Sequence, residues 1–365
     1  MKKILLVVVA LASMNAFATR ARVNALGNSP HLIDTQTVYS NPADMMMMGD
    51  FVTMESGTTT IGAQGTTAEG MVTRSMGDAK MAMSLGHQSA NASATFGLRA
   101  LSGLAGIKSQ QNPVEFSYGM KTSDMAWAAT LVYSNYNDKT ATAEKESSAG
   151  IRAGMRMGAL DAKLHLGLLN TYEKASTGKF KGNLGLTAGA GYSMDNLYVS
   201  GSMTMAGFKS EDNVGAALRD YSSTTMNVSA MSSHKKDGNE FFYGAGLNNV
   251  TAKNTQTVTK DVKTTSLAMP IWLGLEVDAA SWLTLRGSIT QNTLINSSKE
   301  ETTPVAGTDY DFGMGANSTT ASVGAGMKFN KLTLDGSLSD LSGSGAGQTL
   351  NGANLLAQVG MTYMF

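Results

Sequence analysis

From about residue 51 to the last residue, apolar and polar side chains alternate along the chain. In the segment 149–157, alanine, isoleucine and methionine occupy every second position, with glycine and arginine between them. The segments 114–121, 267–277 and 320–329 repeat this pattern. Successive side chains of a strand point to opposite faces, so the alternation predicts strands that are apolar on one face only.

The connections between these segments come in two kinds, which take turns along the chain. The short ones are 122–124, 159–161, 194–196, 278–281 and 330–331, and the long polar ones are 137–147, 172–181, 208–222, 250–264 and 293–316. Short periplasmic turns and long extracellular loops are typical of outer-membrane barrels. The sequence therefore predicts an all-β fold, a transmembrane antiparallel β-barrel over 51–365. We expect about 14 strands, within a range of roughly 12–18.

Aromatic residues gather near both kinds of connection. Those near the short turns are Trp127, Tyr192, Tyr198, Trp282 and Phe329, and those near the long loops are Tyr133, Tyr136, Tyr172, Phe208 and Tyr221. Tyrosine and tryptophan favour the two membrane–water interfaces. The two levels predict aromatic girdles on the outer surface of the barrel.

The chain ends inside a strand, on an aromatic residue. Val359, Met361, Tyr363 and Phe365 share the apolar face of this strand. A closed barrel pairs its last strand with its first, so the chain can stop at the membrane edge. The stretch resembles the C-terminal signal that the bacterial barrel-assembly machinery reads, which implies Tyr363 and Phe365 as the assembly signal. The alternative is the buried last strand of a soluble β-sandwich.

The first residues have the pattern of an export signal. Lys2 and Lys3 precede an apolar run, and residues 16–18 (AFA) match a signal-peptidase site. We expect residues 1–18 to be a signal peptide and the mature chain to begin at Thr19. Combined with the barrel pattern, this predicts the outer membrane of a Gram-negative-type bacterium as the location and its lipid as a partner.

The composition fits a membrane barrel and excludes some partners. Charged residues make up only 15% of the chain, yet no apolar run approaches the length of a membrane helix. Two of the 28 basic residues lie in the predicted signal peptide, so the rest are slightly outnumbered by 28 acidic residues. This balance argues against nucleic acid as a partner. The chain has no cysteine and folds without disulfides. An oligomer is possible, although no sequence feature marks an interface.

Residues 19–50 lack sustained alternation and contain two prolines. The segment is too short to form a core alone, so we expect a periplasmic tail or a plug inside the barrel. A glycine, a later aspartate and then YSNPAD at 39–44 resemble the FadL-type family of outer-membrane transporters, and PorV-like barrels have a similar segment. The resemblance implies a 14-stranded barrel and places Asn41, Pro42 and Ala43 in an N-terminal hatch. The alternative is a plain turn with proline at its second position.

Methionine is frequent, with 25 residues, and many lie on the apolar face, where a soft side chain suits fluid lipid. Four consecutive methionines, 45–48, directly follow the NPAD stretch. They could supply an apolar lining if the segment folds inward. Otherwise they meet lipid or pack near the first strand.

The polar face of the strands would line the lumen and is mostly Gly, Ser, Thr and Asn. The ionisable residues expected there are Arg99, Arg152, Arg156, Lys163, His165, Arg286, Lys328, Glu115 and Glu276, together with Glu55 and Asp335. Arg152, Arg156, Lys163 and His165 fall on one hairpin, so they could form a basic patch that favours anions. Alternatively, these charges pair with the acidic residues and support the wall.

The sequence offers little for catalysis. Its four histidines are scattered, and neither G-x-S-x-G nor a complete G-x-G-x-x-G occurs. Asp309 and Asp311 in a long loop could suggest a barrel protease, but no loop histidine is an evident partner. We therefore expect no enzyme, no cofactor and no metal site.

Three functions remain open. The main prediction is a porin-like channel for passive diffusion of small solutes, narrowed by Arg152, Arg156, Lys163 and Arg286. The first alternative is a FadL-like transporter of hydrophobic compounds, gated by residues 19–50. The second is a non-transporting structural or assembly barrel. An apolar tunnel beside 39–48 would favour the transporter, and a completely filled lumen would favour the structural role.

Overall fold

The computed structural model describes residues 19–57, 67–88, 98–139, 143–255, 261–301, 317–343 and 355–365. The predicted signal peptide, residues 1–18, lies outside the described residues, as do Asp309 and Asp311.

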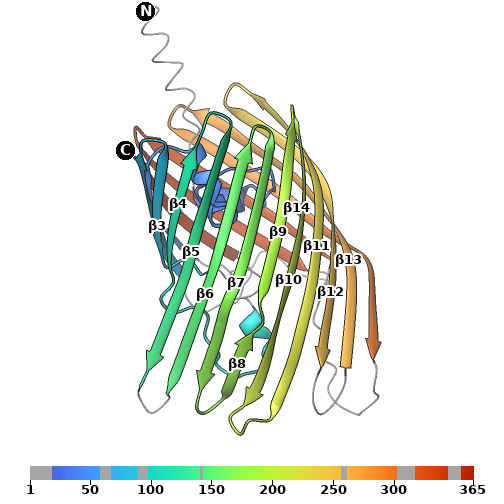
Figure 1. The fold of residues 1–365 in the computed structure, drawn as a ribbon. Coiled ribbons are helices and arrows are strands. Elements are labelled where there is room, and N and C mark those ends of the chain that lie inside the picture. The colour runs from blue at the N-terminus through green and yellow to red at the C-terminus, as the bar shows by residue number, and fades with distance from the viewer. Residues whose placement is uncertain are drawn as a thin grey trace, which may run out of the picture.

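The described strands form one antiparallel sheet that closes on itself (Figure 1). The first strands are β1 (Phe51–Gly57), β2 (Thr67–Met76), β3 (Ala79–Leu85), β4 (Val114–Lys121), β5 (Met125–Asp138), β6 (Glu144–Met157), β7 (Leu160–Lys174), β8 (Gly178–Gly182) and β9 (Gly185–Met194). They are followed by β10 (Leu197–Asp212), β11 (Ala217–Lys236), β12 (Asn239–Thr255), β13 (Asp261–Ala280), β14 (Leu283–Glu301), β15 (Ser318–Phe329), β16 (Leu332–Gly343) and β17 (Leu355–Met364).

The barrel closes between its first and last strands. β1 pairs with β17 from Phe51 opposite Met364 to Gly57 opposite Gln358. The backbone N–H of Phe365 donates to the carbonyl of Asp50 (3.0 Å). The last strand therefore ends where the first begins, as the sequence predicts for a closed barrel.

β8 and β9 share one position in the sheet, because both pair with β7 on one side and with β10 on the other. Over the described residues, the chain therefore forms a sixteen-stranded barrel. The predicted antiparallel barrel is confirmed. Sixteen strands lie within the predicted range, although above the central value of 14 that the family resemblance implies.

Several stretches predicted as long loops continue the strands instead. Most of 137–147, 172–181, 208–222 and 250–264 extends the hairpins, and β11 and β13 each reach 20 residues. Pairing with the neighbouring strand satisfies backbone polar groups beyond the membrane as well as within it. Polar composition alone therefore does not mark where these strands end.

The outward-facing side chains form an apolar surface around the barrel. Leu131, Val323 and Val359 are 59%, 59% and 64% exposed, each at a position that the alternation assigns to the lipid face. A large apolar surface on a closed barrel is what a lipid bilayer covers. Among the residues that the structure describes, no helix is long and apolar enough to span a membrane.

The predicted aromatic girdles are only partly right. Trp127, Tyr133, Tyr192, Trp282 and Phe329 are exposed on the outer surface. Tyr172, Phe208 and Tyr221 are instead buried on the inner side of the wall, and Tyr198 donates inward to Asp161 (3.0 Å). Segments inside the lumen bury aromatic rings as effectively as lipid does. A position near a strand end therefore does not show whether a ring lies on the inner or the outer face of the wall.

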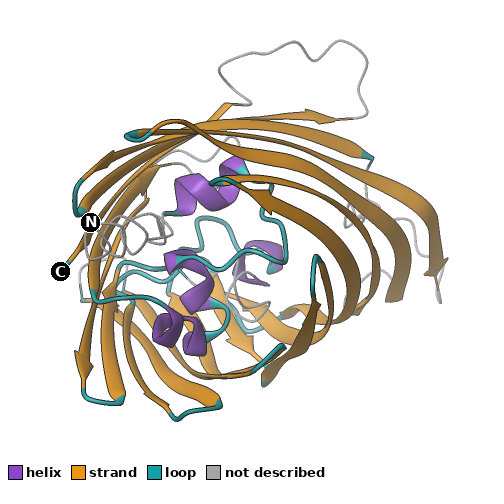
Figure 2. Cartoon of the chain, turned by 90° about the horizontal axis from the view of Figure 1, so that it is seen from above, coloured by secondary structure: helices purple, strands orange, loops and turns teal. Residues whose placement is uncertain are grey.

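Residues 19–50, here called the plug, fold inside the barrel (Figure 2). The plug contains α2 (Arg20–Ala25) and the short 3₁₀ helices η1 (Thr35–Tyr39) and η2 (Pro42–Met47). It lies toward the end that carries the C-terminus and the short turns (Figure 1). Short turns are periplasmic in outer-membrane barrels, so the plug occupies the periplasmic half of the lumen.

The connection between β3 and β4 also enters the lumen. Its described residues 98–113, here called the inner loop, begin with the short 3₁₀ helix η3 (Leu98–Leu101). Contacts with β6, β7, β10 and β11 hold the inner loop inside the wall. The lumen is therefore occupied by two segments that are separate in the sequence, the plug and the inner loop.

Candidate functional site

Buried ion pairs fix the plug to the wall. Arg22 donates through Nε to Glu276 of β13 (2.8 Å) and through Nη1 to Asp34 of the plug (2.9 Å). Burial raises the pKa of Asp34 to about 6, while Arg22 acts in the opposite direction. Removing one partner of such a pair leaves an uncompensated buried charge. These contacts therefore hold the plug in its docked position.

The NPAD stretch docks on strand β6. Asn41 accepts from the backbone N–H of Ala43 (3.1 Å) and so caps η2, which begins at Pro42. Asp44 accepts from Nε of Arg156 (2.6 Å). Burial raises the pKa of Asp44, and Arg156 opposes this shift. The motif thus combines a helix cap with a charged attachment to the wall.

Inward-facing glycines mark places where the plug touches the wall. A Cβ atom at Gly154 would lie 1.9 Å from Oδ1 of Asn41. A Cβ at Gly324 would lie 2.6 Å from that of Ala25. Any larger residue at these two positions would displace the plug, so the glycines on the polar face of the strands provide its seat.

Two glutamates on the first hairpin connect the plug with the start of the β3–β4 connection. Glu55 and Glu69 lie opposite each other in β1 and β2. Arg20 forms an ion pair with Glu69, and its backbone N–H donates to Glu55 (2.7 Å). His87, at the start of the β3–β4 connection, bonds to Glu69 (2.7 Å) and stacks on Tyr39 at 3.5 Å between ring centres. The plug, wall and connection therefore meet at one cluster.

The methionines at 45–48 pack mainly against the first strands. Met45 and Met48 are buried in a core with Tyr39, Phe51 and Met71. This core fills the space between the plug and the wall. The residues that could have lined an apolar tunnel are therefore in contact with one another.

The inner loop is anchored by one arginine. Arg99 donates to Asn170 (2.8 Å), Glu146 (2.9 Å) and Ser148 (2.8 Å), all on the inner side of β6 and β7. Its side chain is almost fully buried. Sequence analysis places Arg99 on the polar face of a strand, but the side chain comes from η3 and reaches the wall from inside the lumen.

An aromatic cluster lies beneath the inner loop. We use this name for Tyr172, Phe180, Phe208 and Tyr221, which project inward from β7, β8, β10 and β11. The rings of Phe180 and Phe208 are 5.0 Å apart, and those of Phe208 and Tyr221 are 5.3 Å apart. Leu98 and Leu104 of the inner loop cover them. The extracellular half of the lumen thus has an apolar wall that the loop shields.

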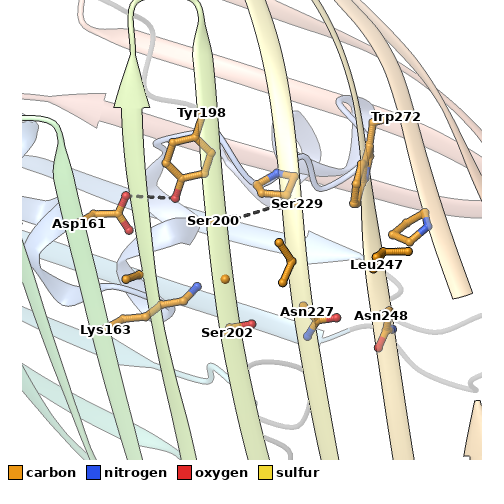
Figure 3. Close-up of a pocket in the computed structure, with 15 residues that line it drawn as sticks. Asp161, Lys163, Tyr198, Ser200, Ser202, Asn227, Ser229, Leu247, Asn248 and Trp272 are labelled. Carbon is orange, nitrogen blue, oxygen red and sulfur yellow. Dashed lines mark hydrogen bonds between the residues drawn. The ribbon is translucent and has the colours of Figure 1, made fainter. Parts of the chain in front are cut away.

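A cavity of about 380 Å³ lies between the plug and the wall (Figure 3). We call it the lumenal cavity. The plug contributes Pro30, and strands β7 and β9–β13 contribute Asp161, Lys163, Ala190, Tyr198, Ser200, Gly201, Ser202, Asn227, Val228, Ser229, Leu247, Asn248, Pro270 and Trp272. A second cavity of about 210 Å³ lies among residues of the plug and shares Pro30, Asp161, Lys163 and Tyr198 with the first. The two cavities form adjoining spaces on one side of the plug.

The charges that line the lumenal cavity are already engaged. Nζ of Lys163 donates to Oγ of Ser40 in the plug (2.8 Å). Asp161 accepts from the hydroxyl of Tyr198 (3.0 Å). One cation and one carboxylate leave the lining without a net charge. The remaining polar groups are hydroxyls and amides, which bind uncharged partners.

The predicted lumenal charges do lie on the inner side of the barrel, mostly in ion pairs. Arg152 pairs with Glu115 (2.5 Å), with both side chains buried. Arg286 contacts Glu276 (2.5 Å) and Asp335 (2.5 Å). Of the predicted basic patch, only Lys163 lines the lumenal cavity.

The other predicted site residues are more dispersed. Lys328 lies 3.4 Å from Asp278 near the short turns. His165 is buried on β7. Tyr363 and Phe365 are exposed on the outer surface, with their rings 5.8 Å apart. These three places lie on different parts of the barrel, so they do not form one site.

Sequence analysis misses most residues that line the cavity. Asn227, Asn248 and Trp272 stand on polar faces of different strands, and no motif connects them. Tyr198 was assigned to the outer girdle. The two-residue alternation along the strand could have placed Tyr198 on the inner face of the barrel, since Ser200 and Ser202 share its face.

A closed barrel with an apolar exterior, a polar interior and an even number of strands is the architecture of Gram-negative outer-membrane proteins. This chain is an outer-membrane β-barrel. No family model matches it. No curated protein matches it either.

Several solved barrel structures have a similar architecture. The chain is similar to a FadL homologue of Pseudomonas aeruginosa, with 11% identity, TM-score 0.47, and 96% of this chain and 98% of that chain covered. It is also similar to the CymD monoaromatic hydrocarbon channel, with 11% identity, TM-score 0.44, and 97% and 99% covered. A porin shows 8% identity, TM-score 0.41, and 86% and 99% covered. Likenesses this remote do not decide the function, which has to be inferred from the lumen itself.

Proposed function

We propose that this protein is a gated outer-membrane channel for small solutes, in which the plug is the gate. A solute enters the lumenal cavity and continues through the smaller cavity among the plug residues. The plug then shifts to release the solute at the periplasmic end. The observation that carries this proposal is the pair of adjoining polar cavities beside a plug held by specific ion pairs.

The occupied lumen supports a gated channel over an open porin. The plug and the inner loop fill much of the interior, and each is attached through buried charged groups such as Arg22 and Arg99. General diffusion needs a continuous water-filled passage. Gating fits a lumen in which space remains beside a displaceable segment.

The same cavities argue against a purely structural barrel. A non-transporting barrel gains stability from filling its interior, since interiors otherwise pack with few voids larger than a water molecule. Here hydroxyl and amide side chains surround an unfilled space of about 380 Å³. A small polar solute fits such a space.

A second candidate function is transport of hydrophobic compounds. The aromatic cluster favours it, because Phe180 and Phe208 give the extracellular half of the lumen an apolar wall. The inner loop would have to leave this cluster before an apolar compound could bind. The polar cavity next along the lumen does not suit such a compound, so we rank this function second.

The test is single-channel conductance of the refolded protein in a planar bilayer, compared with Asp44→Ala. We expect brief openings from the wild type and longer openings of larger conductance from the variant, because the variant loses the attachment to Arg156. Folding of each sample is checked by the mobility shift of unheated barrels on gels. Absence of conductance from both folded proteins would falsify the gated-channel proposal. Binding of apolar dyes without any conductance would instead favour the second candidate.

A further inference from the structure

The lumenal cavity has a chemically distinctive wall. Three serines, 200, 202 and 229, and two asparagines, 227 and 248, supply hydroxyl and amide groups from β10, β11 and β12. Trp272 of β13 adds an aromatic ring, and Figure 3 shows it at the upper end of the same space. An aromatic ring beside neutral donors and acceptors defines an amphipathic binding site.

One polar atom of this wall has no hydrogen-bond partner among the described residues. Oδ1 of Asn248 is buried and accepts no hydrogen bond from the described residues. Ser200 and Ser229 instead bond to each other (2.8 Å) across β10 and β11. A buried amide oxygen without a donor is unfavourable unless water or a ligand supplies one. The Asn248 position therefore favours a ligand with an O–H or N–H group.

From these observations we propose that the lumenal cavity binds an uncharged, ring-shaped polyol of about the size of a monosaccharide. This inference rests on the proposed channel function and names its class of solute. One face of a sugar ring consists of C–H bonds and fits the face of Trp272. The hydroxyls at the rim reach Asn227, Asn248 and the serines.

The size of the cavity agrees with this class. At about 30 Å³ for each water molecule, a space of 380 Å³ holds roughly twelve water molecules. A hexose has a similar number of non-hydrogen atoms, and because these are covalently bonded, the sugar fits with room left for bound water. A longer compound would have to extend into the adjoining cavity of about 210 Å³.

Charge and polarity exclude the main alternatives. An anion would be attracted by Lys163 and repelled by Asp161, and a cation would experience the reverse, so neither gains much from the pair. A hydrocarbon would remove water from Asn227, Asn248 and the serines without replacing their hydrogen bonds, which is costly. A neutral polyol can form hydrogen bonds with the polar groups and pack its C–H face against the ring of Trp272.

The experiment uses the fluorescence of Trp272 in the folded full-length protein. The chain has three tryptophans, and Trp127 and Trp282 are on the outer surface, so Trp127→Phe with Trp282→Phe leaves one reporter in the cavity. The protein in detergent is titrated with glucose, with the anion glucuronate and with toluene. We expect a saturable change in emission with glucose only. A stronger response to glucuronate or toluene, or no saturable response to glucose, overturns the proposal.

Two variants of this reporter assign the response to the cavity. Asn248→Ala should raise the half-saturating glucose concentration about tenfold, because one hydrogen bond is lost. Asn249→Ala is the matched control, since Asn249 is the next residue of β12 and faces the other side of the strand. Equal effects of the two substitutions would contradict binding at Asn248.

Swelling of liposomes that contain the wild-type protein separates this inference from the channel itself. Saturable entry of glucose supports both proposals. Entry of glycine and urea with no saturation by glucose keeps the channel and overturns the polyol site. Failure of every solute to enter, in vesicles shown to contain folded protein, overturns both.

Discussion

Asp44 of the plug accepts a hydrogen bond from Nε of Arg156 on strand β6 at 2.6 Å, with the carboxylate buried. The contact joins the NPAD stretch to a strand more than a hundred residues away. It makes one side of the lumen wall a docking site for the plug. Because the two residues come from different elements, the pair provides a test of whether docking controls conductance.

Breaking this pair should open the barrel. We expect Arg156→Ala and Asp44→Ala to raise the fraction of time in the open state by about tenfold or more, since loss of one partner from a buried pair costs roughly 3–5 kcal/mol. The double variant should resemble either single variant in bilayer recordings. The control is Lys209→Ala, which removes an exposed ion pair with Asp220 between β10 and β11, away from the plug. An additive effect in the double variant would show that the two residues act separately.

A neutral substitution beneath the plug should have the same effect. In Gly154→Ala the new methyl group would collide with Asn41, so the plug should undock although no charge has changed. Gly287→Ala on β14 is the control, because the nearest atom to its added Cβ is 3.7 Å away. Conductance and digestion by an added protease at the plug report undocking. Indistinguishable behaviour of the two variants would mean that Gly154 is not part of the seat.

The Arg152–Glu115 pair should affect stability and leave ion selectivity unchanged. Both side chains are buried and already neutralise each other. Arg152→Ala should destabilise the barrel by roughly 3–5 kcal/mol, and the added change Glu115→Ala should restore part of this loss. Urea unfolding in detergent measures the stability, and reversal potentials in a salt gradient measure selectivity. A clear loss of anion preference in Arg152→Ala would instead support the basic-patch hypothesis.

Loss of Arg99 should release the inner loop. Its guanidinium binds three wall residues, and the leucines beside it cover the aromatic cluster. We expect Arg99→Ala to become sensitive to protease within 98–113 and to bind more of an apolar fluorescent dye. Lys108→Ala provides the comparison, since the Lys108 side chain is 42% exposed and makes a single ion pair among the described residues, with Glu144. If the inner loop of Arg99→Ala stays resistant to protease, another residue anchors the loop.

The last residue should matter more for assembly than for stability. The hydrogen bond of Phe365 to Asp50 uses its backbone N–H, and its ring is on the outer surface. Phe365→Ala should therefore refold in detergent nearly as well as the wild type while accumulating poorly in the outer membrane of cells. The two yields are compared by the gel-mobility shift. Normal accumulation in cells would remove the assembly-signal interpretation.

The wall of the barrel could be predicted closely from the sequence because its signal is local. Leu131, Val323 and Val359 face lipid as the alternation requires, since the period of a strand is fixed by backbone geometry. The strand ends were less predictable. Polar residues beyond the membrane can either pair or form loops, and the choice depends on the neighbouring strand.

The site was much less accessible to prediction. The residues expected to narrow a pore, such as Arg152 and Arg286, could be placed on the inner face because side chains alternate between the two faces of a strand. Their partners could not, because an ion pair depends on the register between strands and on the plug. Likewise, Asn248 and Trp272 become neighbours of one cavity only after β12 and β13 pair beside Pro30.

By itself, the sequence determined the barrel, its two faces and its closure at Phe365, because each depends on the two-residue repeat of paired strands. Only the tertiary structure decided what fills the lumen. The positions of Asp44 on Arg156 and of Arg99 on β6 and β7 depend on contacts between distant segments. No periodic pattern encodes such contacts, since they arise from shape and charge complementarity between an irregular segment and a finished wall.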